Sequence, residues 1–119
     1  GFPAVRKCDI LVAMNQEALD ALIKDLKDTG TLIIDSTNVT SLPETKAKVQ
    51  GMPITEIAKT TFGDTLYANM VMLGALVKAT DIVSPDAVEK TIQKNVSART
   101  VETNIKAFRK GLELQILPA

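Results

Sequence analysis

Two unbroken apolar runs stand near the start of the chain, at residues 10–14 and 31–34. Continuous runs of this kind, without alternating polar residues, are typical of strands that are buried on both faces, as in parallel sheets. Between them the sequence has helical periodicity, with Asn15 suited to cap the start of the helix and Gly30 suited to end it. The apolar positions of that helix share one face: Leu19, Leu22, Ile23 and Leu26. The pattern predicts a strand–helix–strand unit over residues 8–35 with a right-handed crossover.

The next segment is polar and weakly periodic. We expect a short helical turn at 44–49, a short strand at 52–55, and a second helical turn at 56–61 that ends at Gly63. The proline in the expected strand favours a position at the edge or the start of that strand. This part of the chain therefore connects the first unit to a helical second half.

The second half contains two clear amphipathic helices. Ser84-Pro85-Asp86 combines a capping serine, a proline at the first helical position and an acidic side chain near the positive end of the helix dipole. The last helix is predicted over 101–115, and one side of it is apolar: Val101, Ile105, Phe108 and Leu112. Its basic residues Lys106, Arg109 and Lys110 are expected to face water.

The most apolar stretch runs from Leu66 to Val77, inside a helix predicted over 65–80. A helix that is apolar all round must be buried all round, either at the centre of the domain or under another subunit. Twelve residues of helix span about 18 Å, too short to cross a bilayer, so we expect no membrane association.

Asn69, Met70 and Gly74 are the candidate interface residues of this stretch. Two roles are open for Asn69. Its side chain hydrogen-bonds either a neighbouring subunit or ligand, or backbone groups of its own domain. The second role is favoured, because most side-chain hydrogen bonds go to backbone or water and not to other side chains. Gly74 is expected to admit a closely packed helix or strand, because glycine inside a helix costs about 1 kcal/mol against alanine.

Composition excludes several functions. With 119 residues, 45% of them hydrophobic, the chain is expected to form a single domain over residues 1–119. Equal numbers of basic and acidic side chains, 14 each, and 3% aromatic residues argue against nucleic-acid binding. Cys8 is the only cysteine and histidine is absent, which excludes iron–sulfur ligation, Cys/His zinc sites and histidine-based triads. We expect no catalytic residue, no bound metal, and, without a signal peptide at the start, a cytoplasmic location.

Only two strands are convincing, yet both look buried on two faces, and such sheets usually have more strands. The predicted fold class is α/β: a three-layer α/β/α, Rossmann-like domain with a mostly parallel sheet, incomplete at its N-terminus. Ligands of such sheets bind outside the carboxyl ends of the strands, which makes Asn15, Gln16, Ser36 and Thr37 the candidate cofactor-binding residues. The alternative, favoured by the residue types, is that Asn15 caps a helix and that the residues after the second strand form a turn.

Four segments in order resemble the gamma subunit of 2-oxoacid:ferredoxin oxidoreductases. They are KCDILVAMNQEA at 7–18, GTLIIDS at 30–36, PITEIA at 53–58 and ANMVMLGA at 68–75. Together they cover most of the chain. A complete gamma subunit also begins with a strand and a G-x-G-G-Q-G loop, which this sequence lacks, so we expect a fragment or a truncated homologue.

The resemblance implies a subunit of a complex that oxidatively decarboxylates a 2-oxoacid to an acyl-CoA and passes electrons to ferredoxin. Thiamine diphosphate and iron–sulfur clusters are then expected on alpha, beta and delta subunits, with coenzyme A associated with the gamma side and no cofactor held by this chain alone. The isolated chain is expected to be inactive. Pyruvate, oxoglutarate and branched-chain oxoacids all stay open as substrates.

Two other functions are compatible with the sequence. The first is a non-catalytic assembly module that forms a homodimer through the helix at 66–77. The second is a nucleotide-binding α/β domain, which the sequence supports less because it has no phosphate-binding loop.

Overall fold

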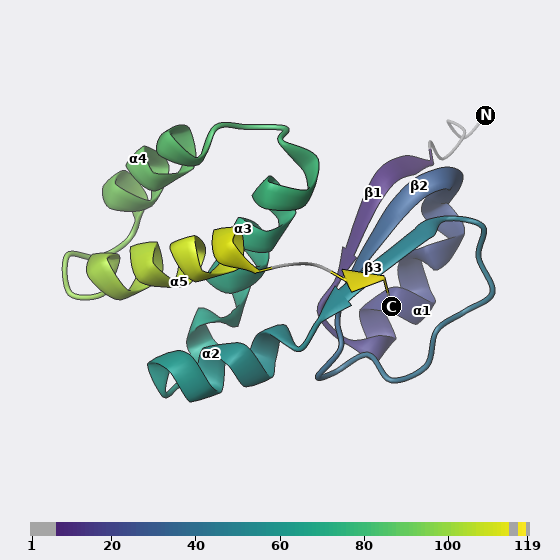
Figure 1. The fold of residues 1–119 in the computed structure, drawn as a ribbon, viewed down its shortest axis with the longest axis horizontal. Coiled ribbons are helices and arrows are strands. Elements are labelled where there is room, and N and C mark those ends of the chain that lie inside the picture. Colours follow the sequence, from purple (N-terminus) through teal and green to yellow (C-terminus); the bar gives the residue numbers. More distant parts are fainter. Residues whose placement is uncertain (1–6, 115–116, 119) are drawn as a thin grey trace, which may run out of the picture. The chain divides into compact units, whose positions relative to one another are not determined.

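The computed structural model describes residues 7–114 and 117–118 of the chain. They divide into two units, one formed by the chain up to Pro53 together with residues 117–118, the other beginning at Ile54 (Figure 1). Each unit has a cluster of buried apolar side chains. The interpretation of residues 1–119 as a single domain stays a prediction.

The first unit is built on a sheet with the strand order β1-β2-β3-β4. The first three strands run parallel, and β4 pairs with β3 in the antiparallel direction. In chain order the elements are β1 (Cys8–Ala13), α1 (Gln16–Leu22), the 3-10 turn η1 (Ile23–Asp25), β2 (Leu26–Asp35), β3 (Lys48–Met52) and β4 (Leu117–Pro118). The α/β fold class, the mostly parallel sheet and the strand–helix–strand unit are confirmed.

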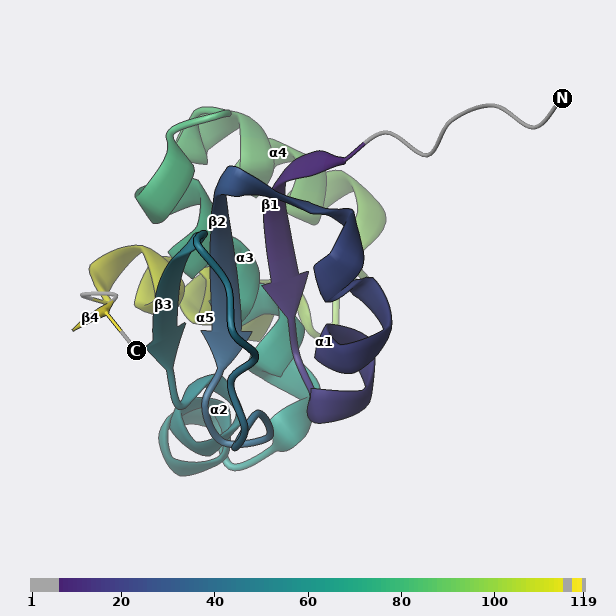
Figure 2. The ribbon, with the colours of Figure 1, turned by 90° about the vertical axis from the view of Figure 1, so that its right-hand side faces the viewer.

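Helix α1 packs against one face of this sheet (Figure 2). Alternate residues of β1 and β2 point to that face because side chains of a strand alternate between its two sides. The two strands place Leu11 opposite Leu32 and Ala13 opposite Ile34. All four side chains are buried in one cluster with Leu19 of α1. The apolar runs of the sequence therefore supply the core of the first unit.

The helix after β1 is shorter than the sequence predicts. Its pattern continues to Gly30, but β2 already begins at Leu26, which is buried opposite Cys8 of β1. Leu22, expected on the apolar face, is 44% exposed. Gly30 lies inside β2, where a Cβ would come within 2.7 Å of the Asp9 carbonyl oxygen. The glycine thus permits close contact between strands and does not end the helix.

Two expectations for the connection to the second unit are wrong. Residues 44–49 form no helical turn but lead into β3, which begins at Lys48. The strand expected at 52–55 lies earlier, at Lys48–Met52. Pro53 has no N–H to continue the strand ladder, and the helix α2 starts directly after it.

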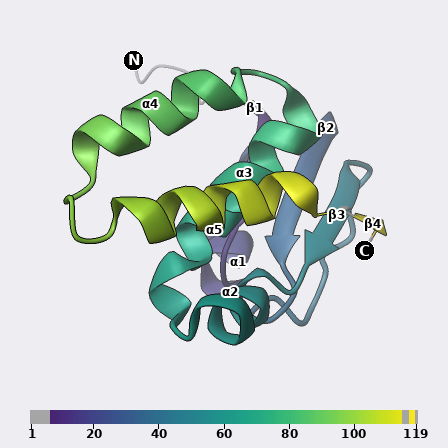
Figure 3. The same cartoon turned by 60° about the vertical axis from the view of Figure 1, so that its left-hand side comes forward.

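The second unit is entirely helical. Its elements are α2 (Ile54–Phe62), the 3-10 turn η2 (Thr65–Tyr67), α3 (Ala68–Thr80), α4 (Pro85–Asn95) and α5 (Val101–Glu113). The sequence predicts that the last helix reaches Gln115, which lies outside the described residues. Val77, Ile92 and Phe108 form the buried centre where α3, α4 and α5 meet (Figure 3). The amphipathic patterns of α4 and α5 are confirmed.

The ends of these helices follow the predicted caps. Gly63 adopts a φ of 77° after α2, and its N–H donates to the Lys59 carbonyl at 2.9 Å. At the start of α4 the Ser84 hydroxyl accepts from the Ala87 N–H at 3.2 Å. Such caps satisfy backbone groups that the helix itself leaves unbonded.

Helices α3 and α5 cross at a pair of glycines. A Cβ on Gly74 would overlap the Phe108 carbonyl oxygen and would lie 2.9 Å from Gly111 Cα. A Cβ on Gly111 would in turn overlap the Val71 carbonyl oxygen. The backbones therefore touch directly, which confirms that Gly74 admits a closely packed helix and identifies that helix as α5.

Candidate functional site

The candidate site is the edge of the sheet at the carboxyl ends of β1 and β2. Because the two strands are parallel, the residues that follow them emerge at the same edge. Asn15 and Gln16 follow β1, and Ser36 and Thr37 follow β2. The structure thus brings all four predicted cofactor-binding residues to one edge, and their hydrogen bonds define what each can do.

Asn15 acts as the cap of α1. Its backbone is extended, and its side-chain oxygen accepts from the Ala18 N–H at 2.8 Å. This geometry agrees with the alternative prediction that Asn15 caps a helix, because its side-chain oxygen is already bonded to the helix backbone.

Gln16 connects the start of α1 to the loop after β2. Its Oε1 accepts from the backbone N–H of Thr40 at 3.0 Å and of Ser41 at 2.9 Å. Its Nε2 donates to the Ser41 carbonyl and to the Asp20 carboxylate, each at 2.9 Å. Both polar atoms of the amide are therefore occupied by the chain itself. Gln16 holds the loop and is not free to bind a ligand with that amide.

Asp35, the last residue of β2, organises the first half of the same loop. It is 0% exposed, and its Oδ1 accepts from the Thr37 N–H at 3.1 Å. Its Oδ2 accepts from Asn38 Nδ2 at 3.4 Å, and its carbonyl accepts from the Asn38 and Val39 N–H groups. A buried carboxylate needs such partners, since burying the charge without them is costly.

From its residue type and position, Asp35 is expected only to help form the turn after the second strand. The available signal was an aspartate directly after a buried apolar run and before Ser-Thr-Asn, a combination that favours local side-chain to backbone bonds. What it could not indicate is that the carboxylate is withdrawn completely from solvent.

Ser36 and Thr37 contribute mainly through their backbone. The Ser36 N–H donates to the Met52 carbonyl at 2.9 Å, which extends the pairing of β2 with β3, and its side chain is exposed. Thr37 is half-buried. Their assignment as cofactor-binding residues stays a prediction.

The loop that follows β2 carries no charge of its own. From Ser36 to Pro43 the sequence contains no charged side chain. The exposed side chains of this stretch are Ser36, Asn38, Thr40, Ser41 and Leu42. They offer hydroxyl and amide groups and one leucine that is 46% exposed. This chemistry suits hydrogen bonding and apolar contact, and it contains no pair of groups suited to acid–base or nucleophilic catalysis.

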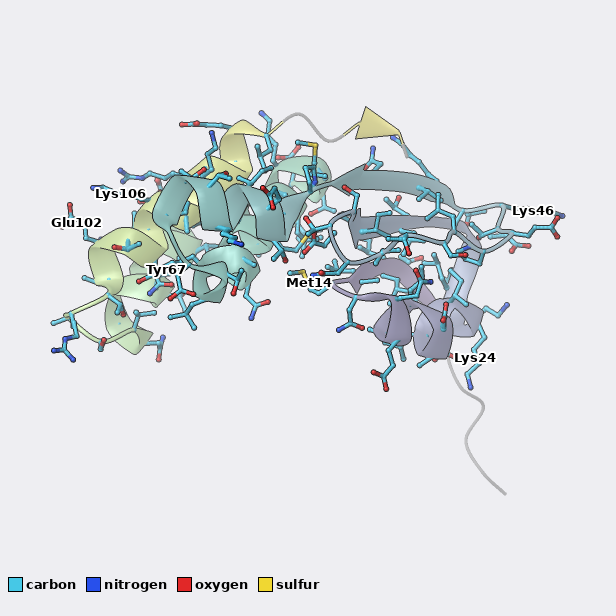
Figure 4. All side chains as sticks on the ribbon, turned by 90° about the horizontal axis from the view of Figure 1, so that it is seen from below. Met14, Lys24, Lys46, Tyr67, Glu102 and Lys106 are labelled. Atoms are coloured by element: carbon cyan, nitrogen blue, oxygen red, sulfur yellow. The ribbon has the colours of Figure 1, made fainter. Side chains whose placement is uncertain are left out.

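Two cations of the second unit, Arg109 and Lys106, form ion pairs. Arg109 donates to both carboxylate oxygens of Glu89, at 2.7 and 3.2 Å, and these hydrogen bonds and the charge of Glu89 raise the pKa of Arg109. Lys106 pairs with Glu102 along α5 at 3.2 Å (Figure 4). Within residues 7–114 and 117–118 no cluster of three metal-ligating side chains occurs, and no helix is long and apolar enough to span a bilayer.

The three predicted interface residues lie in different environments. Gly74 is buried against α5, and Met70 is half-buried against the apolar cluster of the second unit. Asn69 is exposed, so this chain by itself does not bury the helix all round. The alternative, that another subunit covers part of the helix, stays a prediction. Leu66, at the start of the apolar stretch, is 70% exposed in η2. Of the three, Asn69 is the one whose side chain is accessible to a partner.

Residues 2–114 match the family described as pyruvate ferredoxin/flavodoxin oxidoreductase. The chain belongs to this family. Within it, the chain is 40% identical to the 2-oxoglutarate synthase subunit KorC of Methanocaldococcus jannaschii over 115 residues, which cover 95% of this chain and 62% of that subunit.

Solved structures of the family agree. The keto/oxoacid ferredoxin oxidoreductase gamma subunit of Geobacter sulfurreducens is 42% identical, with a TM-score of 0.84, over 89% of this chain and 63% of that one. The pyruvate oxidoreductase subunit PORC of Thermotoga maritima is 26% identical, with a TM-score of 0.74, over 98% and 68% of the two chains. The resemblance drawn from four sequence segments is confirmed. The chain spans about 62% of the length of the KorC relative.

Proposed function

We propose that this chain is a gamma-type component of a 2-oxoacid:ferredoxin oxidoreductase complex, and that its contribution is assembly and the shaping of a binding edge. The observation that carries the proposal is the uncharged loop after β2, held in place by Gln16 and Asp35, in a chain of this family. Its exposed groups can bind, but they cannot by themselves break the bonds of an oxoacid.

The proposed complex uses thiamine diphosphate, coenzyme A and iron–sulfur clusters. Cys8 is the only cysteine, so this chain cannot supply the thiolates of a cluster. The edge also does not fit the phosphates of coenzyme A, because residues 36–43 contain no cation and α1 has only 7 residues. We therefore place the clusters, thiamine diphosphate and the phosphates of coenzyme A on alpha, beta and delta subunits, with ferredoxin reached through them.

The similarity to KorC supports 2-oxoglutarate as the 2-oxoacid to test first. Pyruvate and branched-chain oxoacids are the comparison substrates, because other relatives are named for pyruvate and for ketoisovalerate. We also propose a cytoplasmic location, where reducing conditions keep the half-buried Cys8 as a thiol.

The test is purification of the tagged protein from cells that express it, followed by identification of the copurifying subunits. The purified assembly is assayed for ferredoxin reduction that depends on both coenzyme A and a 2-oxoacid. We expect alpha and beta subunits to copurify, and the activity to be lost when this chain is removed. Copurification of no oxidoreductase subunit would contradict the proposal.

A second candidate, self-association, rests on exposed apolar side chains of the second unit. Leu66, Ile82 and Val83 are 70%, 61% and 47% exposed. Light scattering at increasing protein concentration separates the two: a constant dimer without other subunits supports self-association, whereas a monomer that assembles only with them supports the first proposal. Binding of nucleotides has no supporting observation in the described structure.

A further inference from the structure

The last described strand, β4, closes the outer edge of β3. Its two residues pair with that strand in the antiparallel direction, Leu117 opposite Gly51 and Pro118 opposite Gln50 (Figure 1). The other described strands of the sheet all run parallel to one another. Without β4, the backbone N–H and C=O groups on this side of β3 would be unpaired, as they are at any open sheet edge.

The β3 edge has the features by which proteins prevent the addition of a foreign strand. Lys48 at the start of β3 is exposed, and Pro53 follows directly after the strand. The covering strand β4 is very short and contains a proline, which has no N–H to offer to a further strand. Charged side chains, prolines and short strands at an edge all hinder pairing with another chain. The described sheet therefore ends at β4 on this side.

The pairing of β4 is weak, because it is short and closes a long loop. Five residue pairs join β2 to β3, whereas two join β3 to β4. The second unit lies between β3 and β4 in the sequence, so the whole of it belongs to the loop that their pairing closes. Two residue pairs do not offset the entropy of closing so long a loop in an unfolded chain. Residues 117–118 therefore pair only when the second unit is folded, and they are the first part of the sheet to detach.

We propose that residues 117–118 are a detachable strap on the β3 edge. While the strap is paired it blocks this edge, and when it leaves, the edge pairs with the β3 edge of a second copy of the chain. A twofold axis makes that pairing antiparallel, and in the register centred on Gln50 it sets Lys48 opposite Met52. No like charges then lie opposite each other, which would be destabilising. The inference does not depend on the proposed oxidoreductase complex.

A backbone change in the strap tests the proposal without altering β3. Leu117→Pro removes the N–H of residue 117 and leaves the strap without any amide donor, since Pro118 already lacks one. Leu42→Pro is the matched control, because Leu42 also precedes a proline but lies in an exposed loop outside the strands. Each variant is prepared in the complete protein and checked for folding by circular dichroism. Hydrogen exchange of the β3 amides and light scattering at increasing protein concentration are then measured.

A disulfide supplies the opposite perturbation, because it holds the strap closed. Gln50→Cys with Pro118→Cys places two cysteines directly opposite each other on adjacent strands, close to the separation that a disulfide needs. Lys48→Cys with Pro118→Cys is the control pair, which is out of register with the observed pairing. Both pairs are made with Cys8→Ser, since Cys8 is a free thiol.

We expect Leu117→Pro to exchange the β3 amides on the strap side about tenfold faster than the wild type, as the loss of about one backbone hydrogen bond predicts. Its association constant for dimer formation should rise by about the same factor, while Leu42→Pro behaves as the wild type in both measurements. The 50–118 pair should oxidise faster than the 48–118 pair. Once oxidised, it should dimerise less than the wild type, and reduction should reverse this change.

Three results would overturn the proposal. If Leu117→Pro leaves exchange along β3 unchanged, residues 117–118 do not protect this edge. If exchange accelerates but dimer formation does not increase, a second copy is not the occupant of the open edge. If the oxidised 50–118 pair dimerises as readily as Leu117→Pro, the dimer forms through another surface. Copurification of oxidoreductase subunits tests the proposed function separately, so the two can fail independently.

Discussion

The glycine pair between α3 and α5 gives the most demanding prediction. Gly74→Ala adds one methyl group at a point where the Phe108 carbonyl oxygen already occupies the space, with Gly111 Cα and Leu112 N each at 2.9 Å. All three atoms belong to the backbone of α5, so none can move aside by changing a side-chain rotamer. The two helices must separate for the methyl group to fit.

The expected magnitude is the difference of two opposing terms. Alanine gains about 1 kcal/mol over glycine in helix propensity. Overpacking against a backbone that cannot yield costs about 3 kcal/mol, which leaves a net loss of about 2 kcal/mol in the free energy of unfolding. For a unit of this size that loss lowers the melting temperature by about 10 °C.

Thermal and urea unfolding followed by far-ultraviolet circular dichroism measure this change. Ala79→Gly is the control, since Ala79 is exposed on the same helix and should lose only the propensity term of about 1 kcal/mol. The double variant of Gly74→Ala with Gly111→Ala should lose less than the sum of the two single changes, because helices separated by one methyl group have room for the second. A Gly74→Ala protein more stable than the wild type would refute the reasoning.

The remaining predictions concern single contacts. Gly30→Ala should destabilise the first unit by about 2 kcal/mol in urea unfolding, because its Cβ would lie 2.7 Å from the backbone oxygen of Asp9; an unchanged midpoint would contradict the close strand contact. Ser84→Ala should cost about 1 kcal/mol and increase hydrogen exchange at the Ala87 amide, since that N–H loses its cap. Glu89 raises the pKa of Arg109, so the stabilisation by this pair is fully present below the unfolded-state pKa and is lost only as the pH rises through the raised value. Arg109→Gln should therefore lower the melting temperature equally at about pH 6 and about pH 9, because both values lie well below the range in which Arg109 loses its charge; a clear difference between the two would count against this assignment.

Local chemistry explains which elements the sequence predicted correctly. Ser84, Asn15 and Gly63 each act on backbone groups within four positions, so their roles can be read from neighbouring residues. The apolar stripes of α4 and α5 are equally local, because the helical repeat alone places them on one face.

The helix predicted after β1 is too long for the opposite reason: a contact between distant segments decides where it ends. Leu26 sits at helical spacing from Leu22, and the periodicity therefore extends the helix past its true end. In the structure Leu26 is buried as a strand residue beside Cys8, whereas Leu22 is 44% exposed. Burial against a distant strand outweighs a local preference worth only a fraction of a kcal/mol per residue.

At the candidate site, too, the sequence predicted the local features but not the contacts between distant segments. The sequence located the edge correctly from the ends of the apolar runs, and named Asn15, Gln16, Ser36 and Thr37 there. It could not show that the Gln16 amide is fully used by Thr40 and Ser41, because those partners lie 24 and 25 positions away. Nor could it show that Asp35 is withdrawn from solvent.

By itself, then, the sequence determined the family, the α/β class, the helix caps at Asn15, Gly63 and Ser84, and the chemistries that its residue types exclude, since each depends on residue types and short spacings. The tertiary structure alone decided which backbone Gly74 touches, where the first helix ends, and that Gln16 holds a loop. These three features depend on contacts between segments that are far apart in the chain. Such contacts contribute free energy only after folding has brought the segments together.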